Sequence, residues 1–145
     1  MSSITIGNLP RMTRDVLSTL LLSSTTASAN KLAIIDVRDS DHVGGHIKSS
    51  IWIPSSSLDA RMPELLRTLK DKEKVVFHCS LSQQRGPGAA LRYARERERT
   101  LRVESDEFSA QEVYVLDGGF VKWQEDFGRD ERLTEGYVPD IWEEY

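Results

Sequence analysis

The sequence predicts an α/β fold with a mainly parallel central sheet flanked by helices on both faces. Short runs of mostly apolar and β-branched residues lie at 32–38, 75–77 and 113–116, and such runs are typical of strands buried on both sides. Longer segments with apolar residues at helical spacing separate them. Strands that alternate with helices build a parallel sheet, and ligands of such folds bind outside the carboxyl ends of the strands.

Size and composition fit one soluble domain. The chain has 145 residues, of which 39% are hydrophobic and 29% charged, which suffices for a single core. We expect one domain over 1–145, with 128–145 as an aromatic and acidic tail that packs back on it. The formal net charge of −4 argues against a nucleic-acid partner. Since no segment approaches the roughly 20 apolar residues of a membrane span, no membrane partner is expected.

The first elements are an edge strand and a helix. Ile4-Thr5-Ile6 alternates in polarity, which predicts a short edge strand. Thr13 is placed to cap a helix whose inner face would carry Val16, Leu17, Leu20 and Leu21. The polar stretch 23–30 is expected to be a loop.

The strand 32–38 ends in an acid and a base. Asp36 and Arg38 are best explained as an ion pair or a cap that holds adjacent loops, and catalysis by Asp36 is the less favoured interpretation. His46 follows paired glycines and is either a general base or a turn histidine bonded to backbone. A short strand within 49–53, closed by Pro54, comes next.

Two helices surround the central strand 75–77. Apolar spacing predicts the first over 58–69, with Pro63 at the start of its main segment. The second follows residue 86 and carries arginines and glutamates, including Arg97, that we expect on a solvated outer face. After the last strand, 113–116, the turn 117–120 leads into a short helix.

The only cysteine stands where the central strand ends. Gly86-Pro87 suits a helix start, so the preceding loop lies where backbone N–H groups converge and the helix dipole is positive. A thiol there favours its thiolate form, and Arg85 offers a permanently charged fork for two oxygens of an oxyanion. The sequence predicts phosphoryl transfer through a cysteinyl-phosphate, with Cys79 as nucleophile, Arg85 as oxyanion clamp, and Ser80, Leu81, Ser82, Gln83 and Gln84 as the cradle. The alternative is that Cys79 is a small buried hydrophobe and Arg85 a surface cation.

A single cysteine excludes an internal disulfide and a cysteine-built zinc site. We therefore expect no metal and no cofactor, and a reducing compartment, the cytoplasm or also the nucleus, as the location.

The chain resembles the rhodanese-like domain in Ile34–Arg38, Gly44–Lys48 and Tyr114–Phe120, which flank the cysteine loop in the order of that fold's landmarks. Sulfurtransferases of the fold have a shorter loop. The loop 78–87 is similar to that of the cell-division-cycle dual-specificity phosphatases and fungal arsenate reductases, and most similar to the small single-domain fungal phosphatases. The resemblance implies that Ser82 stabilises the thiolate as a leaving group. Those cell-cycle phosphatases have a glutamate where Gln84 stands, and glutamine cannot act as an acid. The general acid is therefore not identified, and the candidates are a residue of another loop, Asp36, Asp117 and the substrate itself.

The expected function is that of a cysteine-dependent phosphatase acting on a phosphorylated protein or a small phosphate ester. The alternative is arsenate reduction with an external thiol. Sulfur transfer from thiosulfate and a non-catalytic binding module are less favoured, the first by loop length and the second by the intact cysteine and arginine.

Overall fold

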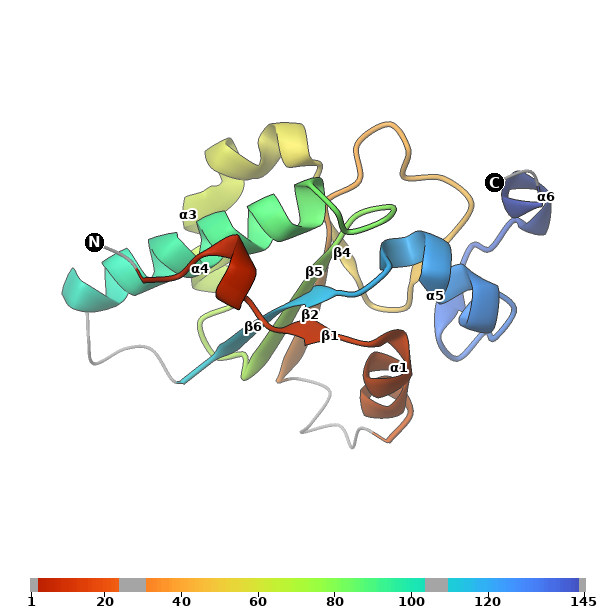
Figure 1. Ribbon diagram of the computed structural model, residues 1–145, viewed down its shortest axis with the longest axis horizontal. Coiled ribbons are helices and arrows are strands. Elements are labelled where there is room, and N and C mark those ends of the chain that lie inside the picture. Colours follow the sequence, from red (N-terminus) through yellow and green to blue (C-terminus); the bar gives the residue numbers. More distant parts are fainter. Residues whose placement is uncertain (1–2, 24–30, 104–109, 144–145) are drawn as a thin grey trace.

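A five-stranded parallel sheet forms the centre of the computed structural model, which describes residues 3–23, 31–103 and 110–143 (Figure 1). Its strands are β1 (Arg11–Met12), β2 (Leu32–Asp36), β4 (Ile51–Trp52), β5 (Lys74–His78) and β6 (Glu112–Leu116). Their order is β1-β6-β5-β2-β4, and every neighbouring pair is parallel. The strand that leads to Cys79 therefore lies in the middle of the sheet.

Helices cover both faces of this sheet, as predicted. The helices α3 (Leu58–Thr68) and α4 (Arg85–Val103) lie on one face, and α1 (Arg14–Ser23) and α5 (Gly119–Phe127) on the other (Figure 1). Side chains of β5 alternate between the two cores: Val75 and Phe77 pack with α3 and α4, whereas Val76 packs with α1 and α5. Such two-sided burial explains the continuous apolar run of this strand.

The remaining elements are short. They are the 3-10 turns η1 (Ile6–Asn8) and η2 (Ser55–Ser57), the helix α6 (Pro139–Trp142), and the antiparallel pair β3 (His46–Ile47) and β7 (Thr134–Glu135). The tail packs on the body, since Trp142 Nε1 donates to the Gly44 carbonyl at 2.9 Å and Tyr137 Oη donates to Gln124 Oε1 at 2.6 Å. Within the described ranges, no helix combines the length and the apolarity needed to cross a membrane.

The prediction of a strand at Ile4–Ile6 is wrong. Thr5 Oγ1 accepts from the Asn8 amide, and the Asn8 side chain accepts from the Thr5 amide, so the segment closes into η1 instead. Strand β1 lies at one edge of the sheet instead, and β4 lies at the other. The cap at Thr13 is confirmed, because its Oγ1 accepts from the Val16 amide at 3.2 Å, but Val16 itself is exposed. The loop predicted at 23–30 lies almost wholly outside the described residues.

Two helix predictions need correction. Pro63 lies inside α3, which already begins at Leu58. The helix tolerates the one hydrogen bond that proline removes because Met62, Leu65 and Leu66 bury its inner face. Arg97 is buried rather than solvated, and burial lowers its pKa. A long arginine stem can cover apolar surface in this way.

Candidate active site

Cys79 follows β5 directly and lies at the N-terminus of α4. Its side chain is buried, and Sγ accepts a hydrogen bond from the Gly86 amide at 3.3 Å. A Cβ at residue 86 would lie 3.2 Å from the Cys79 amide nitrogen and 3.3 Å from His78 Cα, so glycine permits this close approach. The positive end of the helix thus faces the sulfur.

The helix α5 buttresses the loop from outside. The amides of Phe120 and Val121 donate to the carbonyl oxygens of Cys79 and Ser80 at 3.0 and 2.9 Å. In a trans peptide the N–H points opposite to the carbonyl, so the amides of Ser80 and Leu81 point away from α5. These two amides are therefore held in a fixed direction, away from the helix that binds their carbonyls.

Ser82 carries the backbone strain of the loop. Its φ of 55° is left-handed, which is uncommon outside glycine, and its side chain is fully buried. Its Oγ accepts from the Cys79 amide at 3.4 Å, and its carbonyl accepts from Arg11 Nη1 at 3.2 Å. The remaining predicted cradle residues, Leu81, Gln83 and Gln84, are exposed at the surface.

Arg85 begins α4, but its guanidinium is bound by two acids. Nη1 and Nη2 donate to the two carboxylate oxygens of Asp41 at 2.7 and 2.6 Å, and Nη1 lies 3.3 Å from Asp39 Oδ2. Ser80 Oγ donates to the same Asp41 carboxylate at 2.5 Å. The hydrogen bonds between Asp41 and Arg85 lower the pKa of the acid and raise that of the base, and the charge of Cys79 adds to the second effect.

Asp39 and Asp41 were missed as site residues. They directly follow β2, which is hydrogen-bonded in parallel to β5, so both strands end at one edge of the sheet. In the sequence, these residues are visible only as two acids in the segment after a predicted strand. Their place beside the cysteine loop follows from the pairing of β2 with β5, which the sequence does not show.

The ion pair predicted between Asp36 and Arg38 is confirmed. Arg38 Nη2 donates to Asp36 Oδ2 and to the Gly45 carbonyl, both at 2.8 Å, and both charged side chains are fully buried. Asp36 is thus a structural acid out of reach of a substrate.

His46 and Asp117 contact other charged residues. His46 Nε2 lies 3.3 Å from Glu135 Oε1 rather than on a backbone group. Asp117 is 62% exposed and lies 3.4 Å from Arg11 Nη1. Since Arg11 also binds the Ser82 carbonyl, Asp117 stands close to the loop.

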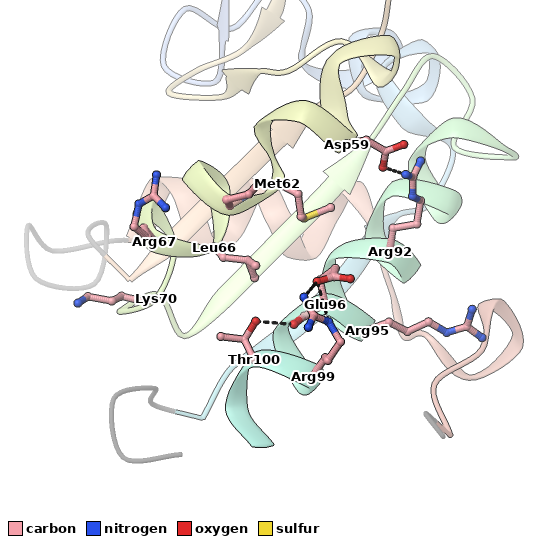
Figure 2. Close-up of a pocket in the computed structure, with 11 residues that line it drawn as sticks. Asp59, Met62, Leu66, Arg67, Lys70, Arg92, Arg95, Glu96, Arg99 and Thr100 are labelled. Atoms are coloured by element: carbon pink, nitrogen blue, oxygen red, sulfur yellow. Dashed lines mark hydrogen bonds and ion pairs between the residues drawn. The ribbon is translucent and has the colours of Figure 1, made fainter. Parts of the chain in front are cut away.

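A groove of about 770 Å³ lies between α3 and α4, away from this loop (Figure 2). Its floor is apolar and its rim basic, and three of the arginines drawn there have partners: Arg92 pairs with Asp59, Arg99 with Glu96, and Arg95 donates to the carbonyl of Ile4. None of the predicted site residues lines it. The predicted nucleophile lies outside this groove, in the Cys79 loop.

Comparisons with known proteins agree with this geometry. The family model described as Rhodanese-like domain matches residues 22–126. The chain is 42% identical to the CDC25-like phosphatase YCH1 of Saccharomyces cerevisiae, over 81% of this chain and 82% of that protein. It is 38% identical to arsenate reductase 2.1 of Oryza sativa subsp. japonica, over 79% of this chain and 71% of that one. A solved structure, described as Ygr203w, a yeast protein tyrosine phosphatase of the rhodanese family, superposes with a TM-score of 0.75 at 37% identity, over 97% of this chain and 99% of that chain.

Proposed function

The chain belongs to the rhodanese-like domain family, and from this premise we propose that it is a cysteine-dependent phosphatase of the protein-tyrosine or dual-specificity type. One observation carries the proposal: the Cys79 sulfur accepts a hydrogen bond from the Gly86 amide at the start of α4. The carbonyls of Cys79 and Ser80, at the start of the same loop, accept hydrogen bonds from α5. A sulfur held this way is a nucleophile beside converging amides. Similarity to a CDC25-like phosphatase supports the same reaction.

In the proposed reaction, Cys79 Sγ attacks the phosphorus of a monoester in line. The S–P bond forms as the P–O bond to the leaving group breaks, and the leaving oxygen takes up a proton. Water then attacks the cysteinyl-phosphate, releasing phosphate and restoring the thiolate. The loop amides and Arg85 stabilise the equatorial oxygens in both steps. Because these groups supply the positive charge, the proposed reaction requires no metal.

The general acid of the first step is proposed to be Asp117 or the substrate itself. Asp117 is exposed beside the loop, whereas Asp36 is buried in its ion pair. An activated ester such as p-nitrophenyl phosphate has a leaving group that needs no acid. The proposed natural substrates are a phosphorylated protein or a small phosphate ester, in the cytoplasm or nucleus.

The test is the variant Cys79→Ser. We expect it to lose turnover of p-nitrophenyl phosphate while it still binds inorganic phosphate, because the loop amides remain. Retained binding, measured by calorimetry, separates loss of the nucleophile from loss of the fold. Turnover at the wild-type rate in Cys79→Ser would overturn the proposal.

Arsenate reduction is the second candidate, favoured by the similarity to a plant arsenate reductase. Arsenate, like phosphate, is a tetrahedral oxyanion that suits this loop. Its reduction to arsenite needs two electrons, and one cysteine cannot form a disulfide within its own chain. The proposed reductant is therefore an external thiol such as glutathione, two molecules of which would be oxidised per arsenite. Arsenite release that depends on added glutathione would support this activity, and no release at any glutathione concentration would exclude it.

A further inference from the structure

The contact between Asp41 and Arg85 spans the two ends of the cysteine loop. Asp41 accepts from Ser80, the first loop residue after Cys79, and from Arg85, the residue that ends the loop. We propose that the Asp41 carboxylate, with Asp39 behind it, is an internal competitor that binds Arg85 in place of the substrate oxyanion and must release it when substrate binds. This inference rests on the proposed function, because it concerns the oxyanion site of that reaction.

The terminal nitrogens of the Arg85 guanidinium already donate hydrogen bonds to Asp41 in the way they would donate to a phosphate group. Both terminal nitrogens donate to the two Asp41 oxygens at 2.7 and 2.6 Å, the bidentate geometry in which a guanidinium also grips phosphate. An oxyanion that takes the same nitrogens has to displace the carboxylate.

Both acids are held in place independently of Arg85. The Asp39 amide donates to Asp41 Oδ1 at 2.9 Å, and Ser80 donates to Oδ2. The other carboxylate, that of Asp39, accepts from Ser55 Oγ at 2.5 Å and from the Ser56 amide at 3.1 Å. Since these bonds do not involve Arg85, the acids can stay in place when the arginine turns to a ligand.

The pair also changes the charge that a ligand meets. One guanidinium beside two carboxylates carries a local charge of about −1, where a free arginine would offer +1 to a phosphate dianion. The side chains of Arg85 and Asp41 are 34% and 37% exposed, so an ion reaches them from solvent and the pair can exchange. The competitor therefore lowers the affinity for every oxyanion that binds Arg85.

The size of the effect follows from the fraction of molecules in which Arg85 is free. The apparent affinity for an oxyanion falls in proportion to that fraction. Because an exposed bidentate pair leaves the arginine free in a minority of molecules, we expect the pair to weaken oxyanion binding about fivefold. Removing the Asp41 charge should recover it. Asp39, which contributes one contact at 3.3 Å, should give a smaller gain.

Calorimetric titration with tungstate, a tetrahedral oxyanion that is not turned over, tests this proposal. We expect Asp41→Asn to bind tungstate about fivefold more tightly than wild type and Asp39→Asn about twofold more tightly. The matched control is Asp126→Asn, which removes an exposed carboxylate that pairs with Arg14 and does not touch Arg85, and its affinity should stay within about twofold of wild type. In an Arg85→Gln background, Asp41→Asn should have no effect.

Several results would overturn the proposal. They are unchanged or weaker tungstate binding in Asp41→Asn, an equal gain in Asp126→Asn, a gain that persists without Arg85, and binding by neither wild type nor variant. Weaker binding would mean that Asp41 positions the arginine instead of competing for it. Because the titration involves no turnover, its outcome is independent of whether the protein is a phosphatase. A wild type that binds tungstate but does not hydrolyse p-nitrophenyl phosphate would refute the proposed phosphatase activity and leave the competition between Asp41 and oxyanions in place.

Discussion

Gly119→Ala should disable the site without touching a reacting group. Gly119 begins α5 at a φ of 61°, against the carbonyls of the cysteine loop. An added Cβ would lie 2.4 Å from the Ser80 oxygen and 2.6 Å from the Cys79 oxygen. An unstrained carbon–oxygen contact is about 3.3 Å, so the loop or the helix must move by close to 1 Å.

The magnitude follows from three contributions. The left-handed backbone costs an alanine about 1 kcal/mol, and each of the two hydrogen bonds from Phe120 and Val121 to the loop is worth about 1 kcal/mol. We expect the free energy of unfolding to fall by about 3 kcal/mol. A displacement of about 1 Å at the loop should also lower kcat/KM by about 100-fold in the folded protein.

Urea denaturation and turnover of p-nitrophenyl phosphate measure the two effects. Gly136→Ala is the matched control: residue 136 has a φ of 67°, and nothing lies within 4 Å of an added Cβ. It should lose about 1 kcal/mol and keep its kcat/KM. The reasoning fails if Gly119→Ala keeps wild-type activity and is no less stable than Gly136→Ala.

Two further predictions concern charge. Replacing Arg38 by leucine strands the buried Asp36 carboxylate and should cost about 3–5 kcal/mol in urea denaturation. The surface pair of Arg132 and Asp130 is the control: Arg132→Leu should lose much less stability, and similar losses in both variants would contradict this prediction. Hydrogen bonds from Arg85 hold the pKa of Asp41 below its unfolded value of about 3.9, so the stabilisation is complete above that pH and is lost as the pH falls through the lower, folded value. Between about pH 6 and pH 3, wild type should therefore lose more stability than Asp41→Asn, and parallel losses would show that the pair contributes nothing.

The strand, loop and helix around Cys79 were predictable because their signals are local. The run Val75–Phe77 marks a strand buried on both sides, and Gly86-Pro87 marks a helix start whatever the rest of the chain does. The ion pair of Asp36 and Arg38 at a strand end was predictable for the same reason.

Other features depend on neighbours that are remote in sequence. The role of Asp41 follows from the pairing of β2 with β5, which brings it to Ser80 and Arg85. Arg97 is buried because of what packs beside α4, although its charge predicts exposure. At Thr5 the error was local: side-chain bonds to the backbone won over an alternation too short to fix a strand.

The most direct test of the central claim is to trap the enzyme during turnover. Wild type mixed with p-nitrophenyl phosphate, denatured within the first turnovers and digested, should yield a peptide phosphorylated on Cys79 by mass spectrometry. The signal should disappear when phosphate release is complete and should be absent from Cys79→Ser. Steady turnover with Cys79 never phosphorylated, or turnover that survives full alkylation of Cys79, would contradict the account.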